Sequence, residues 1–349
     1  MKNMSKIVVV AVFPIIIIVA AAGFFFLNQK NNSVTEYSQS EEVRAENPSK
    51  NPLTGLPVDA GKVNNRPVAI MINNLHSGQP LLGVTEADII YECPTEGGIT
   101  RILGVFKDPS AVPAIGSVRS SRPYFISIAK SLDAIYVHLG GSTHAYSILK
   151  SGYIDSIDLI KGQFMWRDPA RRKNLGLEHS ALTSGEKLGE GIKAHDFRTQ
   201  WNTDYSYPQR FGDDSQVLGG TTATKVTAKF SGYKSTVFAY DEPTQTYLIS
   251  QFNRPQMDDN VKRQNSKPNI ILMNVSGQNI DNTELLALDI IGRGTGKYIS
   301  HGKCIDITWA RDTDTSPFSY FTNDGTPLTM LPGKIYTCLL AQWARADIE

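Results

Sequence analysis

Cysteine is scarce in this sequence, and its three cysteines are far apart. Cys93, Cys304 and Cys338 form no pair of the kind that binds structural zinc, and none follows the N-terminal apolar run, where a lipid would be attached. The sequence therefore indicates neither a cysteine zinc site nor acylation at that position. All three lie in strand-like apolar segments, so we expect buried thiols, with a Cys304–Cys338 disulfide as the alternative.

The sequence also lacks an excess of charge. Its formal net charge is +1 at pH 7, from 35 Lys and Arg against 34 Asp and Glu. Nucleic-acid binding requires a positive field that this balance does not provide, so we exclude nucleic acid as a partner and expect any affinity for anions to be local. Hydrophobic residues make up 41% of the chain, which is enough for the cores of two globular domains.

Familiar catalytic motifs are missing as well. There is no G-x-S-x-G elbow, no H-E-x-x-H zinc helix and no Walker phosphate loop. The segments Gly292–Gly296 and His301–Lys303 are rich in glycine, but they lie between predicted strands, and we interpret them as turns. We predict no cofactor and no bound metal, and the sequence leaves open whether the protein is an enzyme.

What the N-terminus has is one long apolar run, Ile7–Leu27, without a charge or an amide. At about 1.5 Å per residue, a helix of this length spans the roughly 30 Å of a bilayer's hydrocarbon core. Two lysines precede the run and one follows it closely, which favours an N-terminus inside the cell and the remainder outside. We therefore expect a single-pass anchor in the cell membrane over residues 1–27, with a signal peptide cleaved near Ala20–Ala22 as the alternative.

Two domains with different sequence patterns follow a polar segment. Residues 28–50 are too polar to order themselves, and we interpret them as a flexible tether. Residues 51–205 alternate strand-like runs, beginning with Pro67–Ile72, with helix-like segments, which predicts an α/β or α+β domain. Residues 217–345 contain short alternating strands divided by turn residues, which predicts a mainly antiparallel β domain.

The most suggestive polar stretch opens a helix that we predict over Ser117–Lys130. Free N–H groups at a helix start, together with serine hydroxyls and guanidinium groups, suit the binding of phosphate. We therefore predict an anion site that comprises Arg101, Ser117, Arg119, Ser120, Ser121 and Arg122. The alternative is structural, with Arg119 and Arg122 paired to Glu92 or Glu96.

A second stretch follows the strand-like run 134–139. His138 lies near the end of that run, and Gly140 and Gly141 lead into a predicted helix. Because glycines at such a position let a ligand approach the backbone, we add these three residues to the predicted site. His144 is a secondary candidate as proton donor or metal ligand, although hydrogen-bonded structural histidines are commoner.

A third stretch, Trp166–Lys173, places four basic residues beside an aromatic side chain, and Glu178–Ser180 follows it. Such a stretch is suited to phosphate or an anionic polymer, whereas a solvated loop is the alternative. The secondary candidates from this stretch and from the preceding strands are Arg167, Asp168, Glu92 and Glu96.

Short motifs spread along the chain resemble those of the YerB-like lipoproteins of Gram-positive bacteria. In chain order these motifs are Asn51–Gly55, Arg66–Asn74, Ala87–Glu92, Glu96–Arg101, Ile115–Arg122, His138–Ser142, Trp166–Asp168, Trp309 and Leu331–Lys334. The resemblance covers essentially everything after the tether and implies an extracytoplasmic, membrane-tethered protein with the two domains of that family. It implies no particular activity, and the lipid-anchoring cysteine of many relatives is missing here.

The arginine–serine stretch and the missing catalytic motifs favour a binding function, with a phosphate-bearing envelope glycan or lipid as the ligand. A weaker similarity of layout to the LytR-CpsA-Psr phosphotransferases keeps a second hypothesis open. In it the protein is a phosphotransferase or hydrolase that acts on a polyprenyl-pyrophosphate-linked glycan. A structural partner in a membrane complex is the third hypothesis.

Overall fold

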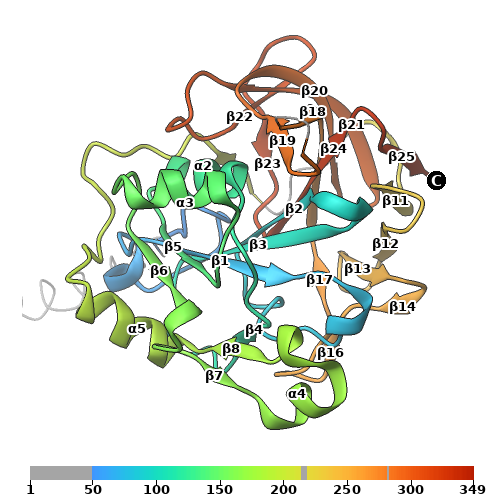
Figure 1. Cartoon of the computed structure of the whole chain (residues 1–349). Coiled ribbons are helices and arrows are strands. Elements are labelled where there is room, and N and C mark those ends of the chain that lie inside the picture. The colour runs from blue at the N-terminus through green and yellow to red at the C-terminus, as the bar shows by residue number, and fades with distance from the viewer. Residues whose placement is uncertain (1–48, 214–217, 281–282) are drawn as a thin grey trace, which may run out of the picture. The chain divides into compact units, whose positions relative to one another are not determined.

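A 12-stranded mixed sheet extends through both halves of the part of the chain that the computed structural model describes, residues 49–213, 218–280 and 283–349 (Figure 1). In spatial order its strands are β10 (Thr221–Thr222), β21 (Lys303–Arg311), β20 (Gly292–Ser300), β18 (Asn269–Asn279), β24 (Ile335–Ala341), β2 (Ile89–Pro94), β3 (Thr100–Phe106), β1 (Val68–Asn73), β5 (Ile135–His138) and β6 (Ser156–Asp158), with β19 (Leu286–Asp289) beside β18 and β22 (Ser319–Thr322) beside β21. Strand β2 pairs in parallel with β24, so the two halves share one sheet.

The middle of this sheet is buried. Every residue of β1, β2, β3 and β24 is buried, as expected for apolar runs that are covered on both faces. The strand predicted at Pro67–Ile72 is β1, shifted by one residue. Apolar runs of this kind are the clearest strand signal in the sequence, which is why this prediction holds.

Helices cover part of one face of the large sheet. The α-helices of the described residues are α2 (Pro123–Ser131), α3 (Thr143–Lys150), α4 (Pro169–Leu175) and α5 (Gly185–Ala194), and the 3-10 helices are η1 (Ala60–Lys62), η2 (His76–Gly78), η3 (Glu96–Gly98), η4 (Leu159–Lys161) and η5 (Leu177–His179). Residues Ala69 and Met71 of β1 belong to the hydrophobic core that contains α2. Ile70 and Ile72, which point to the opposite face, belong to a second core.

A second sheet contributes to that second core. Its strands are β14 (Arg254–Pro255), β13 (Thr246–Gln251), β12 (Ser235–Asp241), β11 (Lys225–Lys229) and β25 (Arg345–Ile348), with β17 (Ser266–Lys267) on β13. Three small sheets pair β15 (Met257–Asp258) with β16 (Arg263–Gln264), β23 (Thr329–Met330) with β9 (Arg210–Phe211), and β8 (Ala181–Thr183) with β4 (Ile115–Gly116) and β7 (Trp166–Arg167). The predicted mixed α/β N-terminal region and β-rich C-terminal region are both confirmed.

The helix predicted over Ser117–Lys130 is shorter than expected. It begins only at Pro123, and the residues before it are extended. A proline disfavours the helical conformation of the residue before it, and Arg122 accordingly has φ −134° and ψ 155°. All three cysteines are buried and free, which confirms the expected thiols in place of a disulfide.

The predicted anchor Ile7–Leu27, and the predicted tether up to residue 48, lie outside the described residues. Within residues 49–213, 218–280 and 283–349, no helix is both long and apolar enough to cross a membrane.

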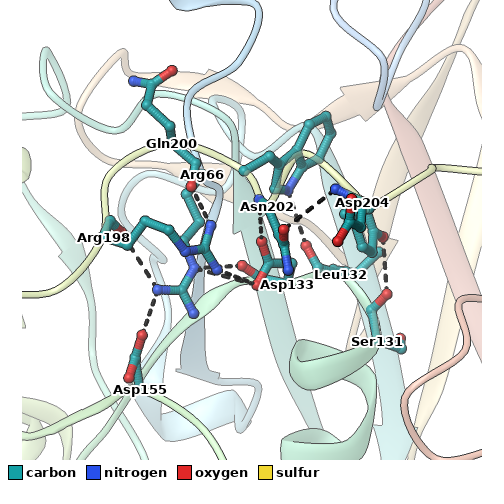
Figure 2. A network of polar contacts seen from close by, with 11 residues as sticks. Arg66, Ser131, Leu132, Asp133, Asp155, Arg198, Gln200, Asn202 and Asp204 are labelled. Carbon is teal, nitrogen blue, oxygen red and sulfur yellow. Dashed lines mark hydrogen bonds and ion pairs between the residues drawn. The ribbon is translucent and has the colours of Figure 1, made fainter.

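The segment after α5 is fixed by a polar network around Asp133 (Figure 2). The Asp133 carboxylate accepts hydrogen bonds from Arg198 Nη2 at 2.6 Å and from the Asn202 N–H at 3.0 Å. Arg66 donates to the Asp133 carbonyl and to the Asp155 carboxylate. Two aromatic side chains further along also donate to backbone carbonyls of this region. These contacts hold the chain in place where it leaves the N-terminal half.

Candidate functional site

The predicted anion stretch Ser117–Arg122 is extended and runs alongside the ends of β1 and β5. The N–H of Leu139 donates to the Arg119 carbonyl at 3.0 Å, and Ser121 forms a parallel bridge with Gly141. The fold therefore brings the arginine–serine stretch and the glycine stretch side by side. The sequence could only place them as separate candidates.

Three arginines gather at this junction, and we call Arg101, Arg119 and Arg122 the arginine edge. Arg101 lies near the start of β3 and is 8% exposed, and its Nη1 donates to the Ser120 carbonyl at 3.1 Å. Burial, together with the charges of Arg122 and Arg119, lowers the pKa of Arg101 to about 10. Charges change a neighbour's pKa only over short separations. The three guanidinium groups therefore lie close enough together for their positive charges to add.

Two of these arginines are paired with carboxylates. Arg122 donates from Nε and Nη2 to the two oxygens of Glu96, each at 2.8 Å, so the predicted pairing with Glu96 is confirmed. Arg119 donates to Glu178 Oε2 at 3.1 and 3.2 Å. Among the described residues, Arg101 has no carboxylate within ion-pair distance. The arginine edge thus carries three guanidinium groups against two carboxylates.

Half of the other predicted site residues are buried. Ser117, Ser121 and His138 are at most 1% exposed, and the Ser121 hydroxyl accepts a hydrogen bond from Tyr136 at 2.8 Å. Burial lowers the pKa of His138 even though the Asp158 carboxylate raises it, so we expect a neutral imidazole at pH 7. The members of the predicted site that remain partly exposed, apart from the arginines, are Ser120, Gly140 and Gly141.

Glu92, a secondary candidate, lies in the core. It is fully buried and accepts hydrogen bonds from Thr100 at 2.7 Å, Thr236 at 2.8 Å and Tyr336 at 2.7 Å, while Lys234 Nζ lies 3.4 Å away. Its side chain faces strands β12 and β24 of the C-terminal half. The alternative in which Arg119 and Arg122 pair with Glu92 or Glu96 is therefore confirmed for Arg122, through Glu96, and wrong for Arg119, whose partner is Glu178.

The third predicted stretch forms β7 and α4. Asp168 caps α4 by accepting from the Arg171 N–H at 2.7 Å, and Arg167 donates to the Leu177 carbonyl at 2.7 Å. Arg171 is not part of a solvated loop, since it is 9% exposed and its guanidinium donates, at 2.7–2.9 Å, to the carbonyls of Gly78, Pro80 and His179. His144, the remaining candidate, is partly buried in the first turn of α3. Within the described ranges, no group of three or more His, Cys, Asp and Glu side chains could hold a metal ion.

A chain of hydrogen bonds that sequence reasoning missed runs from Asn73 through His179 to Ser77. His179 Nδ1 lies 2.7 Å from Asn73 Nδ2, and its Nε2 lies 3.0 Å from Ser77 Oγ. Gly78 makes room for this contact, because a Cβ there would lie 2.1 Å from Asn73 Nδ2. Ser77 and His179 are 102 residues apart, so no local pattern connects them.

The orientation of the Asn73 side-chain amide sets the donor and acceptor in each of these hydrogen bonds. Its Oδ1 accepts from the Leu75 N–H at 3.1 Å, so its Nδ2 faces His179 and can only donate. Burial and the charge of Arg119 lower the pKa of His179, which favours a neutral imidazole with its proton on Nε2. In this tautomer His179 cannot accept the proton of Ser77. Ser77 is therefore not an activated nucleophile, and its hydroxyl proton is directed away from His179.

Two family models match the chain. The model described as "Protein of unknown function (DUF3048) N-terminal domain" matches residues 53–198, and its C-terminal counterpart matches residues 226–337. The chain belongs to this family. In this member of the DUF3048 family, the first range contains the mixed α/β region with the arginine edge, and the second lies in the β-rich region.

Similarity to YerB confirms the resemblance seen in the sequence motifs. The chain is 27% identical, over 305 residues, to the Bacillus subtilis (strain 168) protein named "Putative lipoprotein YerB", with 86% of this chain and 88% of that protein covered. The crystal structure of the YerB protein from Bacillus subtilis matches with a TM-score of 0.75 at 25% identity, over 85% of this chain and 99% of that chain. The two-domain fold is thereby shared with YerB.

Proposed function

We propose that the protein binds an anionic, phosphate-bearing ligand of the cell envelope at the arginine edge. The observation that supports this most strongly is the excess of guanidinium groups, because Arg101 is buried without a carboxylate partner among the described residues. A buried charge is stable only when an opposite charge or several acceptors replace water. An anionic ligand would supply that charge.

Backbone groups at the same junction add to the positive potential. Helices α2 and α3 begin there, at Pro123 and Thr143, and the first turn of α2 has no side-chain cap. Helix N-termini favour anions, and guanidinium groups form paired hydrogen bonds with phosphate oxygens. A phosphate group is therefore the anion that fits this chemistry best.

Binding of inorganic pyrophosphate to the full-length protein in lipid nanodiscs tests this proposal. We expect Arg101→Gln and Arg119→Gln each to weaken binding by about tenfold or more, since a hydrogen bond to a charged group contributes about 1.5–3 kcal/mol. Arg345→Gln is the matched control, because Arg345 is exposed in the C-terminal strand β25. Binding that is absent, or that is equal in all four proteins, would remove the arginine edge as a site.

We also propose that the folded part lies outside the cytoplasm, held by the apolar run Ile7–Leu27 and a tether. The tether predicted over residues 28–50 ends by residue 48, because Ser49 accepts from the Val58 N–H and Lys50 forms a bridge with Pro57. The name of the similar Bacillus subtilis protein, "Putative lipoprotein YerB", supports attachment to the outer face of the membrane. Resistance to alkaline extraction from membranes, with digestion by protease added outside the cells, is the expected result. Recovery of a shortened soluble protein would favour cleavage after the apolar run instead.

Enzymatic action on a polyprenyl-pyrophosphate-linked glycan would use the same arginines, since guanidinium groups stabilise charge that develops on phosphates. It would also need a base for the attacking group. The nearby carboxylates of Glu96 and Glu178 are each engaged by an arginine, and His179 holds its proton toward Ser77. We therefore prefer binding, and release of the lipid by the purified protein would reverse this preference.

A further inference from the structure

A cavity of about 630 Å³ lies where the turn at η2 meets the end of α4 and the β13–β14 hairpin. This volume is typical of sites that hold small molecules. None of the three arginines of the arginine edge lines it. Its lining includes Ser77, Gln79, Leu175, Gln251, Phe252 and Met257.

Three glutamines of this lining, Gln79, Gln251 and Gln256, have unpaired amide atoms, and in Gln256 the unpaired atom is Nε2. Gln79 Nε2 and Oε1 are both buried without a hydrogen-bond partner among the described residues. Gln251 is 3% exposed; its Nε2 donates to Thr236 at 3.0 Å, but its Oε1 is also buried and unpartnered. Buried polar groups are nearly always hydrogen-bonded, so these atoms call for an explanation. A ligand that offers both an N–H and a carbonyl would pair with Gln79.

Phe252 forms an apolar wall of the cavity, and its backbone has an uncommon conformation. It has φ +54° and Asn253 has φ +58°, so both occupy the left-handed region in the turn between β13 and β14. Asn and Gly are the usual residues there, and a bulky aromatic residue is an outlier. The Phe252 ring lies edge-on to His76 at 5.4 Å and 5.7 Å from the Tyr233 ring, so it is held in place. Such outliers cluster at ligand sites.

Ser77 adds a directed hydrogen-bond donor. Because His179 donates to Ser77 Oγ, the hydroxyl proton of Ser77 is directed elsewhere, and Ser77 is exposed at the cavity lining. Successive hydrogen bonds polarise one another, which makes this hydroxyl a better donor to a carbonyl oxygen.

We propose that this cavity is a binding site for a short peptide with apolar side chains. The N–H and carbonyl of one residue, which point to the same side of an extended peptide, pair with Gln79. A neighbouring carbonyl accepts from Ser77, and an apolar side chain packs against Phe252, Met257 and Leu175. The site goes beyond the proposed anion binding, because it uses other residues and an uncharged ligand.

The test uses full-length protein in lipid nanodiscs, with empty nanodiscs as the blank. The probes are N-acetyl-leucyl-leucine methylamide, its analogue with an ester in place of the central amide, and N-acetylglucosamine. We expect the amide to bind, and the ester to bind about five- to tenfold more weakly because it lacks the N–H that Gln79 Oε1 accepts. N-acetylglucosamine carries the same amide without an apolar side chain, and we expect no binding of it.

Gln79→Glu and Phe252→Asn should each weaken peptide binding by about tenfold, while Gln278→Glu, at an exposed glutamine, should leave it unchanged. Phe252→Asn suits the left-handed turn, so it should fold. Pyrophosphate binding should survive all three substitutions, which separates this proposal from the arginine edge. Equal binding of amide and ester, wild-type affinity in both cavity variants, or binding of N-acetylglucosamine alone would overturn the peptide site.

Discussion

Three cations in the interior show how this protein accommodates buried charge. Lys267 Nζ donates to the carbonyls of Val84 and Thr85 at 3.0 and 3.1 Å, and the Arg311 guanidinium donates to a set of carbonyl and hydroxyl oxygens. Lys234 Nζ lies instead 4.5 Å from the centre of the Phe252 ring and 3.4 Å from the carboxylate of Glu92. Each charge therefore has oxygen or π partners in place of water.

The protonation of Lys234 should make stability depend on pH. Burial lowers its pKa from 10.5 to about 8, although the charge of Glu92 raises it. Between pH 8 and 10 the unfolded state therefore binds more protons than the folded state, and stability contributed by this residue rises with pH.

We expect the unfolding free energy of the wild type to rise by about 2 kcal/mol across pH 8–10 relative to Lys234→Met, measured by urea denaturation. Lys150→Met, at an exposed lysine, is the control and should follow the wild type. Parallel pH curves for the wild type and Lys234→Met would show that the buried amine remains charged.

At the scale of elements, α4 depends on its cap. Asp168 accepts from the Arg171 N–H at the start of this helix, and Pro169 occupies its first turn. Asp168→Ala should lower the unfolding free energy by about 1 kcal/mol, whereas Asp168→Asn, which keeps a side-chain acceptor, should cost much less. Pyrophosphate binding should be unchanged in both variants. Equal losses of stability would point to the Asp168 charge, which also acts on Arg171.

Elements formed by local patterns were predictable from the sequence. The apolar runs of β1, β2 and β3 predict buried strands because burial on both faces requires continuous apolar residues. The predicted start of α2, at Ser117, is six residues too early, since the helix begins at Pro123. Pro123 disfavours the helical conformation at Arg122, so the residues before it stay extended.

The site was predictable only in part, because its contacts are long-range. The arginine edge joins β3 to the segment before α2, and Arg101 could be proposed as a member from its strand position. The hydrogen bonds that connect Asn73 to Ser77 run through His179. The buried guanidinium of Arg171 donates to the carbonyl of Gly78, which lies 93 residues earlier in the sequence. Such contacts leave no periodic or motif signal in a single sequence.

At the scale of the whole described part, the two halves depend on one another. Strand β2 pairs with β24 over four residues, and Glu92 of β2 accepts hydrogen bonds from Thr236 and Tyr336 of the C-terminal half. Removing either half would expose the edge of a buried sheet and leave Glu92 without several of its donors.

We therefore expect one cooperative unfolding transition for residues 49–349 despite the two matched domains. Trp166 and Trp201 report on the first half, and Trp309 and Trp343 on the second. Variants that keep only one pair of tryptophans should give coincident urea transitions in fluorescence, and these should match far-ultraviolet circular dichroism. Separate midpoints for the two pairs would show that the halves unfold independently.

The pairing of β2 with β24 also determines when the large sheet can form during synthesis of the protein. Glu92 and its partner Tyr336 are 244 residues apart, so at about 5–20 residues per second a ribosome delivers β24 roughly 10–50 s after β2. During that interval the nascent N-terminal half presents an open strand edge, the kind of surface that recruits other chains. Productive folding must therefore wait for the last strands, and we expect it to be slow and to need protection by a chaperone until the chain is complete.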